Sequence, residues 1–261
     1  MRPMSVKKLL DLSAKVAVVT GGSRGLGLQI AEALGEMGAR LALTARNKDE
    51  LDSAVAHLGN QGIGAVPFVC DIGRREQIAP FAEEAMKLFK KIDILVNNAG
   101  ATWGAPAETH PLDAWDKLVS VNMSGLFALT QIVARKSMIP AKWGRIINVA
   151  SVAGLMGQDP RFAATAAYTA TKHGVVGLTR QLAAEWGVHG ITVNAICPGF
   201  FPSKMTRATL ETAGKLIQEW TPTRRLGGDE DLKGLAVLLA SEASRHITGQ
   251  AIAVDGGATI V

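Results

Sequence analysis

Tyr168 and Lys172, which stand four positions apart, are the pair of side chains in this sequence best suited to acid–base chemistry. They belong to a segment of helical periodicity that begins near Ala167, so they share one face of a helix and can meet. A free tyrosine has a pKa of about 10, and proton transfer near pH 7 requires about 4 kcal/mol of extra stabilisation of its anion. An ammonium group about 4 Å away supplies about that much at an effective dielectric constant of about 20. The spacing therefore predicts that Lys172 lowers the pKa of Tyr168, which acts as a general acid or base.

A glycine-rich loop lies far upstream of this pair, between a short β-branched run and a segment of helical period. Gly21 permits a tight turn, Gly25 lets the backbone approach a pyrophosphate, and Gly27 lets the helix pack closely on the strand. The N-terminus of the helix then points at the phosphate groups. The loop predicts a dinucleotide site, to which Ser23 and Leu26 would also contribute.

The residues at the end of the second predicted strand indicate which dinucleotide would bind. A carboxylate there would hydrogen-bond the ribose 2′-hydroxyl of NAD, but the sequence has Ala45 followed by Arg46. Arg46 and the loop residue Arg24 can both donate guanidinium hydrogen bonds to a 2′-phosphate. We therefore expect NADP(H). The alternative is that Arg46 is a solvated residue ahead of a helix capped by Asn47, and that Arg24 is a surface charge.

Two further clusters follow the third and fourth predicted strands. Asp71 and Ile72 come after the third strand, and Asn98, Ala99 and Gly100 come after the fourth. At the carboxyl ends of parallel strands, these residues are positioned to contact an adenine and a ribose. Asp, Asn and Gly are also common turn residues, which is the alternative explanation for them.

The elements that must position these residues alternate along the whole chain. The predicted strands are apolar on both faces, which suits a parallel sheet covered by helices on each side. They lie at 16–19, 41–44, 66–69, 92–96, 145–149, 192–196 and 251–254. The predicted helices lie at about 25–38, 47–59, 74–90, 112–138, 167–187 and 229–241. This series predicts the α/β class: a doubly wound, Rossmann-type domain with a seven-stranded, mainly parallel sheet and helices on both faces.

No linker, low-complexity stretch or internal repeat divides the sequence, so residues 1–261 are predicted to form one domain. Residues 1–11 precede the first strand as an N-terminal extension. Residues 200–226 interrupt the alternation and contain a short helical stretch near 207–220. Because ligands bind beyond the carboxyl ends of strands, this excursion is a candidate substrate lid; a plain surface insertion is the alternative.

Composition narrows the function classes. The chain has 261 residues, 48% of them hydrophobic, and a net charge of +5, which describes a globular domain rather than a disordered or collagen-like chain. Its two cysteines, Cys70 and Cys197, form no C-x-x-C pair, and the five histidines lack metal-ligand spacing, so no metal site is expected.

No apolar run approaches the ~20 residues of a membrane span and no signal-peptide pattern is present, so we expect a cytoplasmic protein without membrane contact. The basic residues are scattered, which favours a solvated surface over the alternative of a nucleic-acid groove.

Several motifs occur together in an order that is typical of one known family. The sequence has T-G-x-x-x-G-x-G from Thr20, N-N-A-G from Asn97, Ser151, Tyr168-Thr-Ala-Thr-Lys172 and Pro198-Gly199. On these motifs the chain resembles the short-chain dehydrogenase/reductase family over about residues 12–258. Within that family, the tract from Asn194 to Thr206 and the ending Val254-Asp-Gly-Gly257 resemble the gluconate 5-dehydrogenase-like branch.

The resemblance implies a role for each catalytic residue. Tyr168 would give a proton to a carbonyl oxygen while hydride leaves the nicotinamide, and Ser151 would hydrogen-bond that oxygen. Lys172 would hold the nicotinamide ribose and lower the pKa of the tyrosine. Asn122 would support a water molecule that leads protons to Lys172.

The resemblance also completes the predicted cofactor site. Pro198 and Gly199 would contribute to cofactor binding, and the Ser203 hydroxyl just beyond them would meet the carboxamide group of the nicotinamide. Helix capping is the alternative role for Ser203. Tyr168 and Lys172 belong to this site as well.

The substrate pocket departs from the gluconate 5-dehydrogenase pattern. The connection from the serine to the tyrosine is longer than in many relatives, and an apolar tract replaces the basic residues that tend to follow N-N-A-G. Trp103, Phe162 and Phe201 are expected to converge over the tyrosine and give an apolar pocket. Arg161 or Lys204 could instead bind a carboxylate or phosphate, and each is also explained as a solvated charge.

Together these expectations describe an NADP(H)-dependent oxidoreductase that interconverts a ketone and a secondary alcohol. Gluconate 5-dehydrogenase and 3-oxoacyl-thioester reductase are the named alternatives. A non-catalytic NADP-sensing scaffold is the alternative of another class, although a scaffold has no need of Tyr168. The expected assembly is a homotetramer, from the resemblance and from apolar residues on two predicted helices. These residues include Leu126, Leu129, Val133, Val175, Val176 and Leu182.

Overall fold

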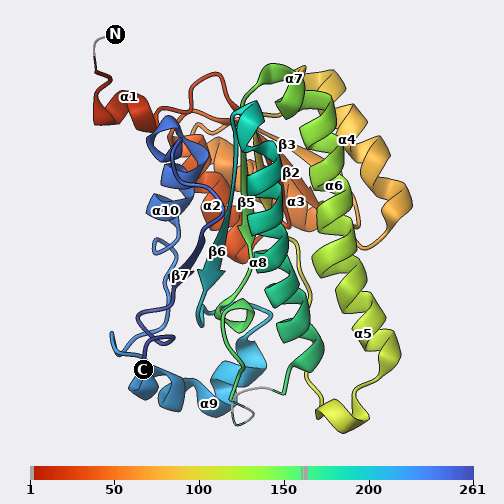
Figure 1. Cartoon of the computed structure of the whole chain (residues 1–261), viewed down its shortest axis with the longest axis vertical. Coiled ribbons are helices and arrows are strands. Elements are labelled where there is room, and N and C mark those ends of the chain that lie inside the picture. The colour runs from red at the N-terminus through yellow and green to blue at the C-terminus, as the bar shows by residue number, and fades with distance from the viewer. Residues whose placement is uncertain (1–2, 160, 162–163) are drawn as a thin grey trace.

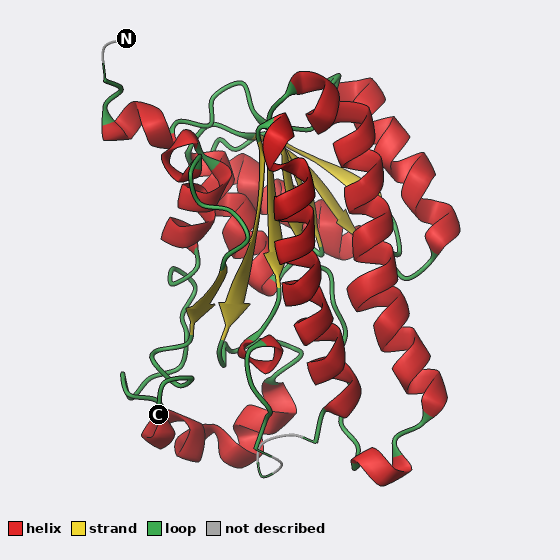
Figure 2. Ribbon diagram, in the orientation of Figure 1, coloured by secondary structure: helices red, strands yellow, loops and turns green. Residues whose placement is uncertain are grey.

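The computed structural model describes residues 3–159, 161 and 164–261, which form a parallel sheet between two layers of helices (Figures 1 and 2). The strands are β1 (Val16–Thr20), β2 (Arg40–Ala45), β3 (Ala65–Val69), β4 (Ile94–Asn97), β5 (Gly144–Val149), β6 (Ile191–Pro198) and β7 (Ala251–Val254). They lie in the order β3-β2-β1-β4-β5-β6-β7, and every neighbouring pair is parallel. The order reverses between β1 and β4, which confirms the predicted doubly wound, seven-stranded fold.

Two sets of helices cover the two faces of the sheet. One face is covered by α2 (Gly25–Glu36), α3 (Lys48–Asn60) and α10 (Lys233–Ala240). The other is covered by α4 (Arg75–Phe89), α6 (Leu126–Val133) and α8 (Ala166–Trp186). Figure 1 shows α4, α6 and α8 along one side of the sheet, with α2 and α10 on the other.

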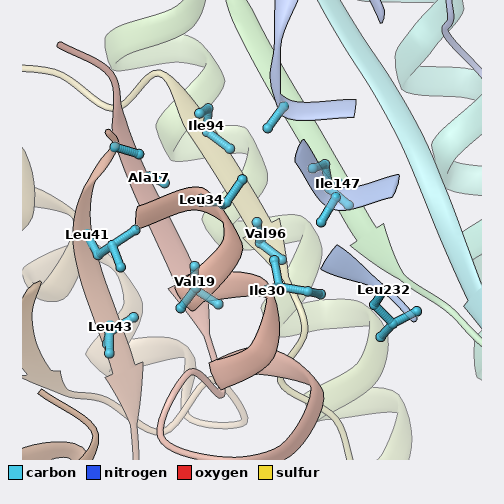
Figure 3. Packing of buried hydrophobic residues seen from close by; sticks show 14 of the residues in the cluster. Ala17, Val19, Ile30, Leu34, Leu41, Leu43, Ile94, Val96, Ile147 and Leu232 are labelled. Atoms are coloured by element: carbon cyan, nitrogen blue, oxygen red, sulfur yellow. The ribbon is translucent and has the colours of Figure 1, made fainter. Parts of the chain in front are cut away.

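The core consists of one apolar layer on each face of the sheet. Ala17 and Val19 of β1 belong to the first layer, and Figure 3 shows them in the same cluster as Ile30 of α2. Val16 and Val18 of the same strand belong to the second layer. Both faces of the sheet are covered by helices, so its strands need apolar residues on both sides. This requirement explains why the strands could be predicted from continuous apolar runs in the sequence.

The segment predicted as a helix over 112–138 is a continuous helical run, Leu112–Ala141, of 30 residues. It comprises α5 (Leu112–Val119), a π-helical turn η2 (Ser120–Gly125), α6, a second π-helical turn η3 (Ala134–Met138) and α7 (Ile139–Ala141). By length and composition alone this run is apolar enough to cross a membrane, a property that a buried core helix shares. In the fold, its residues Leu129, Val133 and Met138 are fully buried in the second apolar layer.

The apolar residues that suggested a subunit interface are buried within the chain itself. They are Leu126, Leu129, Val133, Val175, Val176 and Leu182, each at most 4% exposed. They complete the packing of α6 and α8 on the sheet and offer no surface to a second copy. The inference from these residues is therefore wrong, because periodicity does not distinguish a helix buried on one face from one buried on two.

The carboxyl ends of the strands meet at one edge of the sheet, at the bottom of Figure 1. The predicted lid segment forms α9 (Arg207–Trp220) and its flanking turns near this edge. The N-terminal extension holds a short helix, α1 (Val6–Leu10), at the opposite end of the molecule. The loops that carry the candidate chemistry therefore gather on one side of the fold.

Candidate active site

A cleft of about 1040 Å³ opens at the carboxyl edge of the sheet. All the predicted cofactor residues except Gly27 line it. They are Gly21, Ser23, Arg24, Leu26, Arg46, Asp71, Ile72, Asn98, Ala99, Gly100, Tyr168, Lys172, Pro198, Gly199 and Ser203. One cleft therefore joins the glycine loop to the tyrosine–lysine pair, and its size suits a large ligand.

The glycine loop between β1 and α2 has the backbone shape that its sequence predicts. Gly21 (φ +64°) and Gly25 (φ +52°) both adopt the left-handed conformation. A Cβ on Gly25 would project into open space at the cleft wall, with no described atom within 4 Å. A Cβ on Gly27 would lie 2.3 Å from the Gly21 carbonyl oxygen, so Gly27 allows the helix to pack on the loop. This cradle leaves the backbone and a helix N-terminus accessible to a pyrophosphate, and the loop fits a dinucleotide.

Two polar residues stabilise the cleft wall as well as lining it. Asn98 Nδ2 donates hydrogen bonds to the carbonyl oxygens of Thr20 (3.0 Å) and Gly21 (3.1 Å), which ties the NNAG segment to the glycine loop. The Asp71 carboxylate accepts a hydrogen bond from Gly73 N at 2.9 Å, as a turn residue does. Asp71 and Asn98 therefore stabilise local backbone structure and also line the cleft, so the two explanations for them do not exclude each other.

The arginine end of the cleft contains a carboxylate that the sequence analysis missed. Arg24 Nη1 forms an ion pair with Glu50 Oε1 at 2.5 Å, and Glu50 itself lines the cleft. Arg46 makes no ion pair with any residue that the structure describes. The pattern Asn47-x-x-Glu50 predicts the start of α3, but it does not predict that the glutamate reaches the glycine loop. Lys117 of α5 also lines the cleft. Its position in the sequence did not predict this, because folding brings it there from a distant segment.

The tyrosine–lysine pair and Ser151 lie where β5 and β6 end. Tyr168 and Lys172 occupy the first two turns of α8, and Ser151 follows β5. Lys172 Nζ lies 5.6 Å from the centroid of the Tyr168 ring and donates a hydrogen bond to Val149 O at 2.7 Å. Ser151 Oγ accepts a hydrogen bond from Ala153 N at 3.1 Å and is hydrogen-bonded to the Tyr168 hydroxyl. The three predicted catalytic groups are therefore adjacent.

Burial controls the protonation of this pair. It raises the pKa of the Tyr168 phenol above its usual value, and the hydrogen bond with Ser151 opposes this effect. Burial also lowers the pKa of Lys172 to about 8. The expectation that Lys172 lowers the pKa of Tyr168 is not met by the chain alone, because desolvation is the larger effect and the ammonium group is bonded to Val149 O. Tyr168 is protonated near neutral pH and can donate a proton.

Asn122 lies in the π-helical turn η2 and connects three segments of the chain. Its Oδ1 accepts a hydrogen bond from Ala101 N at 2.8 Å. Its Nδ2 donates to Ala101 O at 2.9 Å and to Thr171 Oγ1 at 3.1 Å. The side chain is thus engaged in fixing the segment after N-N-A-G against α8. The widened π-helical turn that carries Asn122 is of a kind that is frequent at functional sites.

Comparison with known proteins assigns the family. The sequence pattern described as short chain dehydrogenase matches residues 15–214. The chain is 38% identical over 261 residues to gluconate 5-dehydrogenase of Gluconobacter oxydans (strain 621H), covering 98% of this chain and 99% of that protein. The chain belongs to the short-chain dehydrogenase family. This short-chain dehydrogenase is therefore an oxidoreductase.

Two further proteins resemble this short-chain dehydrogenase over almost their whole length. The 3-oxoacyl-(acyl-carrier-protein) reductase of Salmonella typhimurium is 36% identical over 252 residues, covering 97% of this chain and 100% of that protein. A gluconate 5-dehydrogenase from Burkholderia cenocepacia J2315, solved in complex with NADP and tartrate, has a TM-score of 0.92 at 34% identity. The match covers 98% of this chain and 100% of that one.

The three residues expected to form an apolar substrate pocket differ in their surroundings. Trp103 is 49% exposed and is not among the described residues that line the cleft. Phe201 lines the cleft but is buried, with its ring against Gly227, where a Cβ would lie 2.4 Å from the ring. Phe162 lies outside the described residues. Within the described part of the chain, the expected convergence over Tyr168 is not seen, because Trp103 faces solvent.

The segment 200–226, predicted as a lid, brings polar groups to the cleft. Ser203 Oγ accepts a hydrogen bond at 3.2 Å from the backbone N of Thr206, the residue that precedes α9, so Ser203 supports the helix start and also lines the cleft. Lys204 lines the cleft without an ion-pair partner among the described residues. Arg161, by contrast, forms an ion pair with Asp159 at 2.5 Å. Of the two cations considered for binding an anionic group, the cleft contains Lys204.

Proposed function

We propose that this short-chain dehydrogenase interconverts a ketone and a secondary alcohol and uses NADP(H). The observation that carries the proposal is the single cleft that joins the glycine loop to Ser151, Tyr168 and Lys172. NADPH bound in that cleft supplies the hydride. The side chains supply a proton donor, a hydrogen bond to the substrate oxygen and a nearby positive charge, which together suit reduction of a carbonyl group.

Tyr168 is the proton donor in this mechanism. Its phenol is protonated near neutral pH because burial raises its pKa, and its hydrogen bond with Ser151 orients it. A carbonyl oxygen that accepts hydrogen bonds from both hydroxyls is stabilised as negative charge develops on it. Lys172 carries its charge at pH values below about 8, and its Nζ lies 5.6 Å from the ring centroid. Its charge favours the phenolate that remains after proton transfer, against the larger opposing effect of burial on the phenol.

Two arginines support NADP(H) as the cofactor. Arg24 and Arg46 line the cleft, and guanidinium groups match the geometry of phosphate oxygens. The Burkholderia gluconate 5-dehydrogenase with the same fold was solved with NADP, as were two other structurally similar proteins. NADPH is therefore expected to bind at least about ten times more tightly than NADH, a difference of about 1.4 kcal/mol.

A keto acid is the second candidate substrate, and Lys204 is the observation that favours it. Lys204 lines the same cleft as Ser151 and Tyr168, so an anionic group on a bound ketone has a cation to pair with. An apolar ketone makes no use of this charge. Since Trp103 faces solvent, a carboxylate-bearing substrate such as 5-ketogluconate has better support than the apolar pocket expected from the sequence.

A substrate panel tests the proposal. The full chain is mixed with NADPH and with apolar ketones, 5-ketogluconate or 3-oxoacyl thioesters, and oxidation of NADPH is followed by absorbance. We expect turnover of at least one class. Lys204→Ala should raise the KM for 5-ketogluconate and leave the KM for apolar ketones unchanged. Tight NADPH binding without turnover of any class would contradict the proposal and indicate a sensing scaffold.

We also propose a homotetramer that works in the cytoplasm. Leu112, Trp115 and Phe127 of the long helical run are 76%, 39% and 38% exposed and give an apolar surface for a second copy. Cys70 and Cys197 are free and buried, which suits a reducing compartment. Light scattering tests the assembly, and a particle of 27.5 kDa would contradict it.

We expect no binding to nucleic acid. Random DNA mixed with the protein at low salt should therefore show no gel retardation.

A further inference from the structure

Glu50 occupies a position in the cleft that its local sequence does not explain. It lies in the first turn of α3, three residues after the N-cap Asn47, whose side chain accepts a hydrogen bond from Glu50 N at 3.1 Å. A glutamate at this position commonly reaches back to the amide of its own N-cap residue. Here the carboxylate extends to the glycine loop instead, with Oε1 on Arg24 Nη1 at 2.5 Å and Oε2 accepting from Ser23 Oγ at 3.5 Å.

The contact between Glu50 and Arg24 occupies a donor that a 2′-phosphate would need. Arg24 and Arg46 both line the cleft, but only Arg24 is paired with a carboxylate within the described part of the chain. A phosphate monoester carries a charge of about −1.5 to −2 at neutral pH, so Glu50 and the phosphate compete for the same guanidinium group and repel each other. A ribose with a free 2′-hydroxyl has no such charge and does not compete.

We propose that Glu50 limits the preference of this enzyme for NADPH over NADH by holding Arg24 away from the 2′-phosphate. The proposal rests on the NADP(H) cleft of the proposed function and adds a specificity-determining residue to it. Both partners are partly solvent-exposed, at 49% for Arg24 and 36% for Glu50, so the pair can exchange without unfolding any element. Glu50 therefore adjusts cofactor choice, while Arg46 provides the attraction that remains.

The test is titration of the full chain with NADPH and, separately, with NADH. Glu50→Gln keeps the shape and the hydrogen-bonding capacity of the side chain and removes its charge. Because exposed ion pairs contribute up to about 1 kcal/mol, we expect the Kd for NADPH to fall by about two- to fivefold, with no change for NADH. Asp49→Asn is the matched control. It removes the same charge from the same helical turn, but Asp49 is not among the described residues that line the cleft, so both Kd values should stay unchanged.

A second pair of variants identifies the route of the effect. In an Arg24→Ala background, Glu50→Gln should no longer tighten NADPH binding, because the group for which the two anions compete is absent. Raising the salt concentration should shrink the difference between wild type and Glu50→Gln, as for any exposed charge pair. A gain of the same size in the Arg24→Ala background would overturn the proposal, since Glu50 would then act without Arg24.

Two other outcomes would also overturn it. Weaker NADPH binding in Glu50→Gln would make Glu50 a support for the glycine loop rather than a competitor, and equal effects of the two charge removals would leave nothing specific to Glu50. These titrations need no turnover. A failure of catalysis would therefore reject the proposed function and leave this test intact, whereas a failure here leaves the catalytic assignment standing.

Discussion

Lys172 lies beneath Tyr168, with its Nζ 5.6 Å from the centroid of the phenol ring and hydrogen-bonded to Val149 O at 2.7 Å. The two residues share a face of α8, and Val149 is the last residue of β5, so the pair is fixed to the sheet as well as to the helix. Burial raises the pKa of the phenol and lowers that of the ammonium group to about 8. The pair therefore keeps a proton on Tyr168 and a positive charge close to it, which suits donation of a proton to a carbonyl oxygen.

The lowered pKa of Lys172 predicts a pH-dependent stability. The folded value of about 8 lies below the ordinary value of 10.5, so the unfolded chain binds more protons between these pH values. The free energy of unfolding of the wild type should therefore rise relative to that of Lys172→Met as the pH increases from 8 to 10.5, by up to about 1.4 kcal/mol per pH unit. Denaturant unfolding at several pH values measures this difference. The exposed residue Lys136 is the control, and Lys136→Met should follow the wild-type curve. Parallel curves for wild type and Lys172→Met would show that the lysine is not desolvated.

Arg46→Asp should reverse the cofactor preference. The substitution removes a cation that has no ion-pair partner among the described residues and places a carboxylate where it can accept a hydrogen bond from a 2′-hydroxyl. The Kd for NADPH should rise by at least about tenfold, and that for NADH should fall. Calorimetric titration with each cofactor is the measurement. If the ratio of the two Kd values stays unchanged, Arg46 does not contact the adenosine end of the cofactor.

Gly27→Ala should disrupt the glycine loop. The new Cβ would lie 2.3 Å from Gly21 O, so the backbone of the loop or of α2 must move, and NADPH binding should be lost together with some stability. Gly177→Ala in α8 is the control, because no described atom lies within 4 Å of the new Cβ. It should raise the free energy of unfolding by about 0.5–1 kcal/mol. Equal thermal stability of the two variants would indicate that the loop is more open than the structure shows.

Phe201 and Trp103 should differ in their effect on stability. Phe201 is 4% exposed and packs against Gly227, so Phe201→Ala should cost about 3–5 kcal/mol of unfolding free energy. Trp103 is 49% exposed, and Trp103→Ala should change stability by less than about 1 kcal/mol. Chemical denaturation of both variants tests this. A small decrease in the free energy of unfolding of Phe201→Ala would contradict this prediction and indicate that Phe201 contacts the substrate without supporting the fold.

The sheet and most of its ligand edge could be predicted because local patterns determine them. Continuous apolar runs in the sequence predicted all seven strands. The helical stretch predicted near 207–220 is α9 in the structure. The glycine loop and the tyrosine–lysine pair depend on spacing within a single element, so both could be placed before the fold was known. The ends of several helices differ from prediction by a few residues, as at α10, which begins at Lys233 rather than near 229.

The remaining features depend on contacts between elements that are distant in the sequence. The ion pair of Glu50 with Arg24 joins α3 to the glycine loop, and the hydrogen bonds of Asn122 to Ala101 and Thr171 join three segments. The raised pKa of Tyr168 depends on its burial, which spacing does not report. Spacing shows which groups can meet, whereas desolvation and side-chain direction decide what they do there.

The central claim is that Tyr168 donates the proton in an NADPH-dependent carbonyl reduction, and one measurement tests it most directly. NADPH oxidation and NADPH binding are compared between wild type and Tyr168→Phe, using the best substrate of the panel. The phenylalanine keeps the ring over Lys172 and removes only the hydroxyl, so we expect kcat to fall by about 10²–10⁴-fold with little change in the Kd for NADPH. Turnover in Tyr168→Phe at a rate close to that of the wild type would contradict the claim.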